Sequence, residues 1–567
     1  MTTTTLLPFL ARLLAIIPST SATKHPLLLR LLRAGAASTA AIALVLIVET
    51  WHQRRSHWSL PVNPVVGRSI WGHLITMMTT QGERHDWAFW ISRFHLDQGK
   101  GFTSFVHVPF TPVFVLSSDP RTVEWVLKSN FDNYVKGPFF YSAQMPLLGH
   151  GIFNSDGDEW KKQRKTASYI FNVANFRDHM VQVFADHTHD LCAVLDEAAA
   201  SGRSTEGVVD LYDLLHRFTL DAFMEIGFGT SLHSLRQREP LPFAVAFDTA
   251  QSITSRRMVM SPAQRAVVEF LNGDARKLAR CAAVADQFAT KVITERRGEI
   301  AGDDQTVYAD LLSRFLVMKK PDGSGYSDRE LRDVVMNFII AGRDTTAQAL
   351  SWTVYMLHSH PEVVAKLRAE LAEQFPGIGP DQSLWGDSSE SDSSSSSAAD
   401  AYAALSRNLV YARAVFSEAL RLYPSVPTEI KFAVNDDTLP DGSAVRAGDA
   451  VIWSPYAMAR ITEIWGADAA EFKPERWIDQ ATGKFVQPSP FKFPVFNAGP
   501  RVCLGQQMAY LEGVACLATL VHRYELTVVN ADQVKYRNAL TLQMMNGLKV
   551  RPTRRRAGAG AMRPHEE

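Results

Sequence analysis

The sequence predicts a mainly α-helical fold with small β-sheets, preceded by an N-terminal membrane anchor. Residues 331–352 have the length and composition of one long helix, whereas the short apolar run 113–116 precedes a turn and is typical of a strand. Near the N-terminus, residues 34–48 are apolar and uncharged. These observations favour a large helical domain that follows a membrane segment.

Hydropathy and charge predict the N-terminal anchor. The run 34–48 contains about 15 residues, short of the ~20 that span a ~30 Å hydrocarbon core, so flanking apolar residues must complete it while Arg33 snorkels. An earlier apolar stretch, 6–17, is interrupted by Arg12 and is expected to lie in the interface or to re-enter. Because no convincing cleavage site follows, we expect an uncleaved anchor and hinge within residues 1–58.

Basic residues are more frequent before the run 34–48 than after it: Arg12, Lys24, Arg30 and Arg33 against Arg54 and Arg55. The positive-inside rule therefore predicts a cytosolic N-terminus. One membrane pass would then place the following domain on the opposite side. A membrane hairpin that uses both apolar stretches would return that domain to the cytosol, and the sequence leaves both topologies open.

Length and composition bound the rest of the chain. Its 567 residues could hold several average domains, but we expect one large domain over residues 59–557 and a solvated tail at 558–567. A hydrophobic fraction of 46% is sufficient for a sizeable core. With 59 basic and 59 acidic residues the formal charge is zero, which argues against nucleic acid as a partner.

The four cysteines, at positions 192, 281, 503 and 516, form no C-x-x-C pair. They predict neither a disulfide framework nor a zinc ribbon, and they suit a domain that faces the cytosol.

Three further segments have a predicted local structure. The run 113–116 reads as a strand that leads into a helix start at Pro120. A serine-rich insert at about 380–400 reads as a disordered surface loop. The run 541–548 reads as a β-hairpin around Asn546-Gly547, and Pro61–Pro64 reads as a hinge.

The loop 496–505 carries the strongest chemical signal. It combines Phe496, Gly499, Arg501, Cys503 and Gly505 and leads into an apolar segment. A thiolate just before a helix lies near free N–H groups and the positive end of the helix dipole, which suits a metal ligand. The glycines let the backbone pass close beneath a flat cofactor, whose acidic group the arginine could bind. A lone cysteine would more often be a buried structural residue, but the full pattern favours a ligand.

The long helix carries a second signal around Ala341-Gly342. Glycine costs about 1 kcal/mol in a helix relative to alanine. Thr345 lies four residues after Ala341, so its hydroxyl can bond to that carbonyl and open the helix locally. Asp344 and Thr345 together supply an acid and an alcohol, the parts of a proton relay. The alternative is a core helix with a threonine back-bond.

Two more pairs are spaced to share a helix face. Glu418 and Arg421 lie three residues apart in an otherwise apolar segment, so we expect a buried pair that needs further partners, such as Arg476. Trp160 and Arg164 lie four residues apart in a charged stretch. The lysines of that stretch are expected to be solvated surface, although they could also attract an acidic partner protein.

Taken together, the pattern F-x-x-G-x-R-x-C-x-G and the motifs A-G-x-D-T-T, E-x-x-R and W-x-x-x-R resemble the cytochrome P-450 superfamily of haem-thiolate monooxygenases. The likeness covers almost everything after Pro61. It implies a helical prism around a buried haem b. It further implies Cys503 as the axial thiolate ligand of the iron, with Phe496 packed near it and Gly499 in the same loop.

The resemblance also assigns roles to the other motifs. Thr345 would position water at the oxygen-binding face and Asp344 would gate protons. Glu418, Arg421 and Arg476 would form a structural triad. The expected contacts of the haem propionates are Trp160, Arg164, Arg501 and Lys431.

Within the superfamily the chain is most similar to fungal and plant fatty-acid and alkane hydroxylases, on segments 130–134, 151–154, 341–346 and 456–468. This implies a membrane-bound monooxygenase that hydroxylates long-chain fatty acids at or near the terminal carbon. No dinucleotide fingerprint follows the cysteine loop, so electrons are expected from a separate NADPH–cytochrome P-450 reductase, with cytochrome b5 as a second candidate. The implied location is the endoplasmic reticulum membrane, with the catalytic domain in the cytosol.

Alternatives remain open. Among enzymes they are subterminal fatty-acid hydroxylation, n-alkane oxidation, another lipophilic substrate, and rearrangement of a hydroperoxide, against which the acid–alcohol pair counts. Outside enzymes the alternative is a haem-based sensor or carrier.

Overall fold

The computed structural model describes residues 84–556 except 107, 169–173, 202–206, 303–309, 321–322 and 386–403, together with residues 44, 45 and 48. Most of the expected anchor and hinge (1–58), the hinge Pro61–Pro64, most of the serine-rich insert and the tail 558–567 lie outside the described residues. In the part that is described, no helix combines the length and the hydropathy that a membrane crossing requires.

The described chain divides into two compact units. Unit 1 contains the described residues up to Val135 together with Val259–Ser261 and Ile430–Ser454. Unit 2 contains Lys136–Met258, Pro262–Glu429 and the described residues from Pro455 onward.

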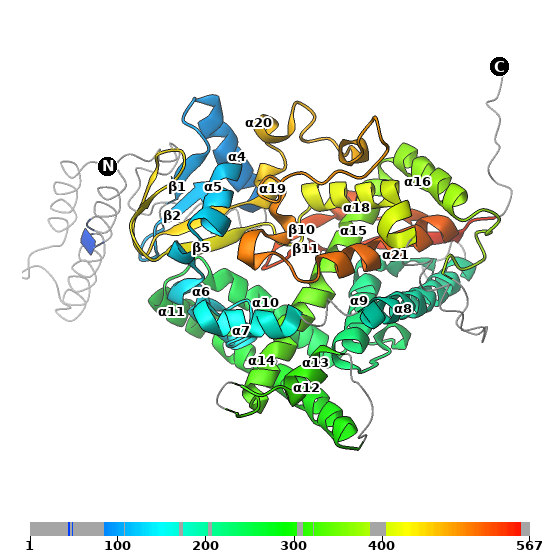
Figure 1. Ribbon diagram of the computed structural model, residues 1–567, viewed down its shortest axis with the longest axis horizontal. Coiled ribbons are helices and arrows are strands. Elements are labelled where there is room, and N and C mark those ends of the chain that lie inside the picture. Colours follow the sequence, from blue (N-terminus) through cyan, green and yellow to red (C-terminus); the bar gives the residue numbers. More distant parts are fainter. Residues whose placement is uncertain are drawn as a thin grey trace, which may run out of the picture. The chain divides into compact units, whose positions relative to one another are not determined.

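Unit 1 is built on a five-stranded sheet with the strand order β1-β2-β8-β5-β3 (Figure 1). The strands are β1 (Thr103–Val106), β2 (Phe114–Ser117), β8 (Ala450–Trp453), β5 (Glu429–Ala433) and β3 (Tyr134–Val135). β2 pairs antiparallel with β1 and parallel with β8, and its four residues are all buried, as expected for a central strand. Helix α4 (Arg84–Asp97) and the hairpin of β6 (Asp437–Thr438) and β7 (Ala444–Val445) belong to the same unit.

The predicted strand at 113–116 is therefore present, one residue later, as β2. The predicted helix start follows it, because Asp119 caps α5 (Pro120–Glu124): its carboxylate accepts from the Arg121 amide at 2.8 Å, and proline takes the first position. The chain then passes through the short helices η2 (Trp125–Ser129) and η3 (Phe131–Asn133).

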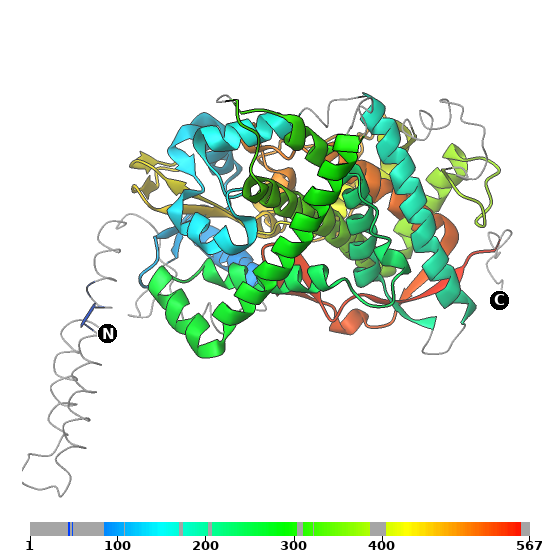
Figure 2. The same cartoon turned by 90° about the horizontal axis from the view of Figure 1, so that it is seen from below.

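Unit 2 is mainly helical, and Figure 2 shows two of its longest helices, α8 in teal and α12 in green, along their length. Its first helices are α6 (Gly137–Leu148), α7 (Gly157–Ser168), α8 (Ala174–Ala200), α9 (Leu211–Phe228), η6 (Ser234–Arg236), α10 (Pro242–Arg257), α11 (Pro262–Asn272), α12 (Asp274–Gly302) and α13 (Leu311–Val317). They are followed by α14 (Asp328–Ile339), η7 (Ile340–Asp344), α15 (Thr345–His358), α16 (Pro361–Gln374), η8 (Ala404–Asn408) and α18 (Val410–Leu422). The last are α19 (Pro455–Met458), α20 (Thr462–Trp465), η9 (Pro474–Trp477), η10 (Pro494–Phe496), η11 (Gly499–Arg501), α21 (Gln506–Arg523) and η12 (Ala531–Gln533).

The predicted long helix is present as the continuous run α14–η7–α15. Ser327 and Glu330 form a capping box at its start, which satisfies free N–H groups of the first turn. α15 packs against α9, α18 and α21 (Figure 1). In that core Trp352 stacks on Tyr423 with ring centroids 4.2 Å apart. Burial of most of its residues explains why α15 is largely apolar and not amphipathic.

Unit 2 also holds two small sheets. β9 (Tyr524–Val528), β12 (Lys549–Arg554) and β4 (Val209–Asp210) form a three-stranded sheet in the order β4-β12-β9, and β10 (Lys535–Asn538) pairs with β11 (Leu542–Met545). The prediction of a mainly helical fold with small sheets is thus confirmed.

The predicted hairpin around Asn546-Gly547 is wrong. Both residues do adopt the left-handed backbone that such a turn needs. However, β11 before the turn pairs with β10, and β12 after it pairs with β9 and β4. Asp210 holds the backbone after this turn, because its carboxylate accepts from the Leu548 amide at 2.9 Å. The approach is so close that a Cβ on Gly547 would lie 2.2 Å from the Asp210 carboxylate.

Candidate functional site

The cysteine loop of unit 2 is folded by a few backbone bonds. It leaves η10, passes through Asn497 and Gly499 with positive φ, and enters α21, whose N-cap is Gly505. The Cys503 amide donates to the Phe496 carbonyl at 2.8 Å, and the Gly505 amide hydrogen-bonds the Cys503 sulfur. The thiol is thereby held at the helix start by an N–H group that favours its charged form.

Cys503 differs from the other cysteines in being accessible. Cys192, Cys281 and Cys516 are buried, whereas the side chain of Cys503 is exposed. Even so, burial raises the pKa of the Cys503 thiol, which the Gly505 amide and the nearby Arg164 partly offset. The sulfur therefore lies deep within the fold and still offers accessible surface, as a ligand to a bound group requires.

One arginine, Arg501, lies within this loop, and a second, Arg164 on α7, contacts it. Arg501 lies 4.2 Å from the Trp160 ring centroid and donates to the Ser155 carbonyl at 3.0 Å and to Asp156 at 2.8 Å. Arg164 donates to the Val502 carbonyl at 2.7 Å. Burial lowers the pKa of Arg501 to about 10, because its charge is only partly compensated.

These arginines fit a cofactor that carries carboxylates. The Nε of Arg501 is buried and has no hydrogen-bond partner among the described residues. An anionic group beside the loop would supply an acceptor for this Nε–H. The same group could also bind Arg164, which lies on the same face of α7 as Trp160. Haem with its two propionates has the charge and flatness that this loop and these donors accept.

Phe496 begins the loop and is half-buried. Its ring centroid lies 5.4 Å from that of Tyr510 on α21, and the Tyr510 hydroxyl is 3.0 Å from the Ser417 hydroxyl on α18. This packing ties the loop to two core helices. Lys431 is buried on β5 in unit 1, and its predicted role at a propionate stays a prediction.

The long helix widens at the predicted place. Residues Ile340–Asp344 form a π-helical turn, and the Thr345 hydroxyl donates to the Ala341 carbonyl at 2.6 Å. Gly342 is needed for packing: a Cβ there would lie 2.0 Å from the Phe223 ring of α9. The glycine thus allows α9 to approach the turn closely, a reason that the sequence did not reveal.

Asp344 is buried and turned toward α10. Its carboxylate accepts hydrogen bonds from Gln251 Nε2 and, at 3.1 Å, from Arg343 Nη1, which also donates to Asp248 at 2.6 Å. Burial raises the pKa of Asp344. In the described part of the chain no hydrogen bond joins its carboxylate to the Thr345 hydroxyl.

Gln251, Asp248 and Arg343 were missed by the sequence analysis. A charged Arg343 inside an apolar helix was the one available signal, because a buried guanidinium needs an acceptor.

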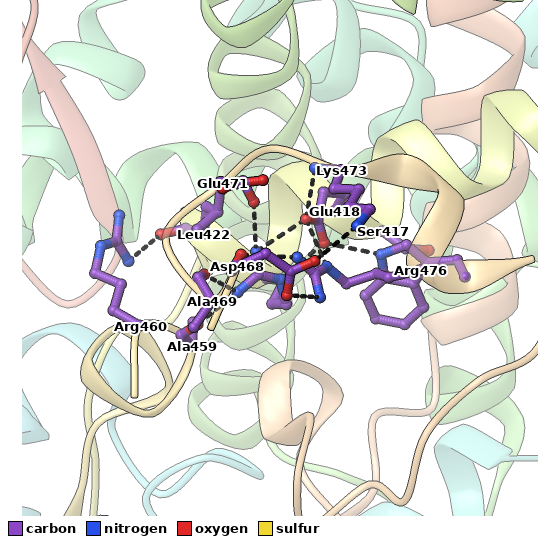
Figure 3. Close-up of polar contacts among 12 residues, drawn as sticks. Ser417, Glu418, Leu422, Ala459, Arg460, Asp468, Ala469, Glu471, Lys473 and Arg476 are labelled. Atoms are coloured by element: carbon purple, nitrogen blue, oxygen red, sulfur yellow. Dashed lines mark hydrogen bonds and ion pairs between the residues drawn. The ribbon is translucent and has the colours of Figure 1, made fainter. Parts of the chain in front are cut away.

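Figure 3 shows the polar contacts of the Glu418 cluster, in which Glu418 and Arg421 are fully buried and Arg476 is largely buried. The Glu418 carboxylate accepts from Arg421 at 2.7 Å, from Arg476 at 2.9 Å and from the amide of Lys473 at 2.8 Å. The indole of Trp477, which the sequence analysis missed, also donates to it at 3.0 Å. The further acceptors of Arg421 are the carbonyls of Ala459, Ala469 and Glu471.

This arrangement brings Glu418, Arg421 and Arg476 together around one carboxylate. Every member is engaged in structure, and the cluster pins the segment 459–477 to α18. Its geometry suits a structural role, not a chemical one.

Comparison with known proteins agrees with this geometry. The family model described as Cytochrome P450 matches residues 68–551. Cytochrome P450 704B1 of Arabidopsis thaliana is 39% identical over 515 residues, which cover 87% of this chain and 94% of the relative. Cytochrome P450 704C1 of Pinus taeda is 40% identical over 471 residues, covering 82% and 89%.

A more distant relative and a solved structure extend the comparison. Cytochrome P450 94A1 of Vicia sativa is 35% identical over 449 residues, covering 77% of this chain and 80% of the relative. The crystal structure of the cytochrome P450DA heme domain superposes with a TM-score of 0.69 and covers 88% of this chain and 98% of that chain. At 23% identity, that structure supports the fold alone.

Proposed function

The chain belongs to the cytochrome P450 family and is a haem-thiolate monooxygenase, and we propose that Cys503 ligates its haem and that it hydroxylates long-chain fatty acids at or near the terminal carbon. The accessible thiol held by the Gly505 amide at the start of α21 supports the first part most directly. Thiolate-ligated haem, when bound, activates dioxygen and places one of its atoms in a C–H bond.

The chain's own residues then stabilise the sulfur ligand, bind the cofactor and position water. The Gly505 amide and Arg164 stabilise the negative charge on the Cys503 sulfur. Arg501, stacked on Trp160, and Arg164 bind the carboxylates of the cofactor. Thr345, whose hydroxyl donates to the Ala341 carbonyl, would position water at the widened turn.

Asp344 is proposed to gate the protons that the reaction consumes. Burial makes its carboxyl a weaker acid than an exposed aspartate, so it can hold a proton nearer neutral pH.

Two hydrogen bonds of Ser425 bring three segments together, and the apolar residues of these segments support an apolar substrate. Its hydroxyl donates to the Thr345 carbonyl at 2.7 Å, and its carbonyl accepts from the Leu542 amide at 2.9 Å. This brings the turn at Val426 and the start of β11 beside the widened turn of the central helix. Val426, Leu542 and Phe338 are apolar, as a site for an alkyl chain requires.

Two measurements test the proposal. Cys503→Ser should abolish the carbon monoxide difference band of thiolate-ligated haem, whereas Cys281→Ser should keep it. A retained band in Cys503→Ser would exclude this cysteine as the ligand.

The substrate is tested with the purified protein, a reductase and saturated fatty acids of graded length, palmitate among them. Mass spectrometry of the products reports the hydroxyl position. A product at the chain end supports the proposal, a subterminal product replaces it with the subterminal alternative, and no product from any acid overturns it.

We also propose attachment to the endoplasmic reticulum membrane and electron supply by an NADPH–cytochrome P-450 reductase, with cytochrome b5 as a second donor. The surface of α11 supports membrane contact: Val267, Phe270 and Leu271 are exposed, whereas the polar Glu269 is buried and pairs with Arg257 at 2.6 Å. An apolar face turned outward suits a lipid interface. In a chain that lacks residues 1–58, Phe270→Ser with Leu271→Ser should lower vesicle binding, and unchanged binding would refute the contact.

A further inference from the structure

Helix α10 reaches the buried Asp344 carboxylate by two routes. Gln251 donates directly to its Oδ2. Asp248 acts through Arg343, whose Nη1 lies 2.6 Å from Asp248 Oδ1 and 3.1 Å from Asp344 Oδ1. The side chain of Asp248 is 47% exposed, whereas those of Arg343 and Asp344 are 5% and 1% exposed. One guanidinium therefore connects a carboxylate at the surface with one in the core.

The amide of Gln251 serves Asp344 specifically. Gln251 is fully buried, and its Oε1 has no hydrogen-bond partner among the described residues. Burying a polar group without a full set of partners costs free energy, and in the described part of the chain the bond to Asp344 is the one hydrogen bond that offsets this cost for the Gln251 side chain.

We propose that Gln251 and Asp248 are positioning residues through which α10 sets the readiness of Asp344 to give up and regain its proton. This rests on the proposed function in one respect, the role of Asp344 as proton gate. Gln251 and Asp248 touch neither substrate nor cofactor in this proposal. They act through the carboxylate and through Arg343.

The two residues act on Asp344 in opposite directions. The hydrogen bond from Gln251 stabilises the charged carboxylate and so lowers the pKa of Asp344, as does Arg343. The negative charge of Asp248 raises it, in the same direction as the burial that dominates. Loss of the Gln251 donor should therefore move the titration of Asp344 to higher pH, and loss of the Asp248 charge should move it to lower pH.

Other titratable groups face the cluster from α9: Tyr212, Asp213 and His216. Burial raises the pKa of Tyr212 and lowers the pKa of His216 to about 4, so both side chains are neutral near pH 7. Asp213 pairs with Arg217 at 2.8 Å. Tyr212 and His216 therefore do not change their charge near neutral pH, whereas burial raises the pKa of Asp213, so the Asp344→Asn blank is needed to separate the two carboxyl bands.

The test is a direct titration of Asp344 in the haem-loaded protein. Infrared difference spectra follow the protonated carboxyl band against pH, with Asp344→Asn as the blank that identifies the band. The variants are Gln251→Leu, with Gln251→Met as a second form in case the first does not fold, and Asp248→Asn. Glu239→Gln is the matched control, because it removes one exposed negative charge just before α10 without a contact to Arg343.

We expect the midpoint to rise in Gln251→Leu, to fall in Asp248→Asn and to stay in place in Glu239→Gln. The pH profile of product formed per NADPH should shift in the same directions. Unchanged midpoints in both variants, or shifts of one sign, would overturn the inference.

The titration needs no substrate, so its outcome is separate from that of the proposed function. If opposite shifts occur and no fatty acid is hydroxylated, the α10 link holds and the substrate assignment fails. If fatty acids are hydroxylated and the midpoints do not move, the α10 link fails alone.

Discussion

Thr345 donates its hydroxyl hydrogen to the carbonyl of Ala341 at 2.6 Å, across the turn where the central helix widens. The side chain thus takes the place of a regular helical hydrogen bond and leaves the hydroxyl oxygen able to accept from water. Since Ser425 donates to the backbone carbonyl of Thr345 itself, the residue is fixed at both ends.

Thr345→Ala should therefore uncouple electron use from product formation. We expect the carbon monoxide difference band to remain and the product formed per NADPH to fall by about tenfold or more, since a positioned proton-transfer group contributes on that scale or above. The matched control is Thr353→Ala, which removes the same kind of back-bond, to the Ala349 carbonyl at 2.7 Å, from the same helix. Equal coupling in the two variants would exclude a relay role for Thr345.

Glu418→Gln should strongly destabilise the fold. The substitution leaves the buried Arg421 and the largely buried Arg476 without their shared counter-charge, and breaking a buried ion pair in this way costs about 3–5 kcal/mol. The measurement is the free energy of unfolding of the haem-loaded protein in denaturant. Glu475→Gln is the control: it breaks a partly exposed pair with Lys366, worth about 0–1 kcal/mol. A loss no larger than that of the control would contradict the structural role.

Two glycine-to-alanine substitutions in helical segments should change stability with opposite signs. At Gly342 the new Cβ meets the Phe223 ring at 2.0 Å, and overpacking of this kind costs about 1–3 kcal/mol. A Cβ added at Gly298 on α12 would have no neighbouring atom outside its own helical turn within 4 Å. Alanine should therefore stabilise the helix there by about 0.5–1 kcal/mol. Thermal unfolding of the two variants measures the contrast. A stabilising Gly342→Ala would mean that α9 does not approach the turn so closely.

Local sequence patterns predicted the parts of this fold that depend on local physics. The long apolar segment around Phe338 became a continuous helix, and the three-residue spacing of Glu418 and Arg421 became a buried pair. The hairpin at Asn546-Gly547 failed because its turn geometry was right but its strands found partners distant in sequence.

The site shows the same limit. The spacing of Asp344 and Thr345 was visible, but Gln251 lies 93 residues away and only the packing of α10 brings it to Asp344. Trp477 likewise joins Glu418 across 59 residues. Contacts of this kind follow from how helices cross, and a single sequence does not contain that information.

Glu512 on α21 predicts how stability depends on pH. It is buried, and burial raises the pKa of its carboxyl to about 8, because among the described residues only a hydrogen bond from Thr346 on α15 offsets the burial. The folded protein therefore holds this proton more tightly than the unfolded chain, in which a glutamate titrates near ~4.3. The stability that depends on this proton is complete below the unfolded pKa and is lost as pH rises toward and through the folded pKa.

Glu512→Gln should remove this loss, because glutamine stays neutral at all pH values. We expect the variant to be more stable than the parent near pH 8 and the difference to shrink steadily toward pH ~5. The control is Glu197→Gln, an exposed glutamate on α8, which should leave the pH dependence unchanged. The measurement is the free energy of unfolding from pH ~5 to ~9 for the parent and both variants. Parallel curves of this free energy against pH for the parent and Glu512→Gln would mean that Glu512 is already ionised in the folded protein.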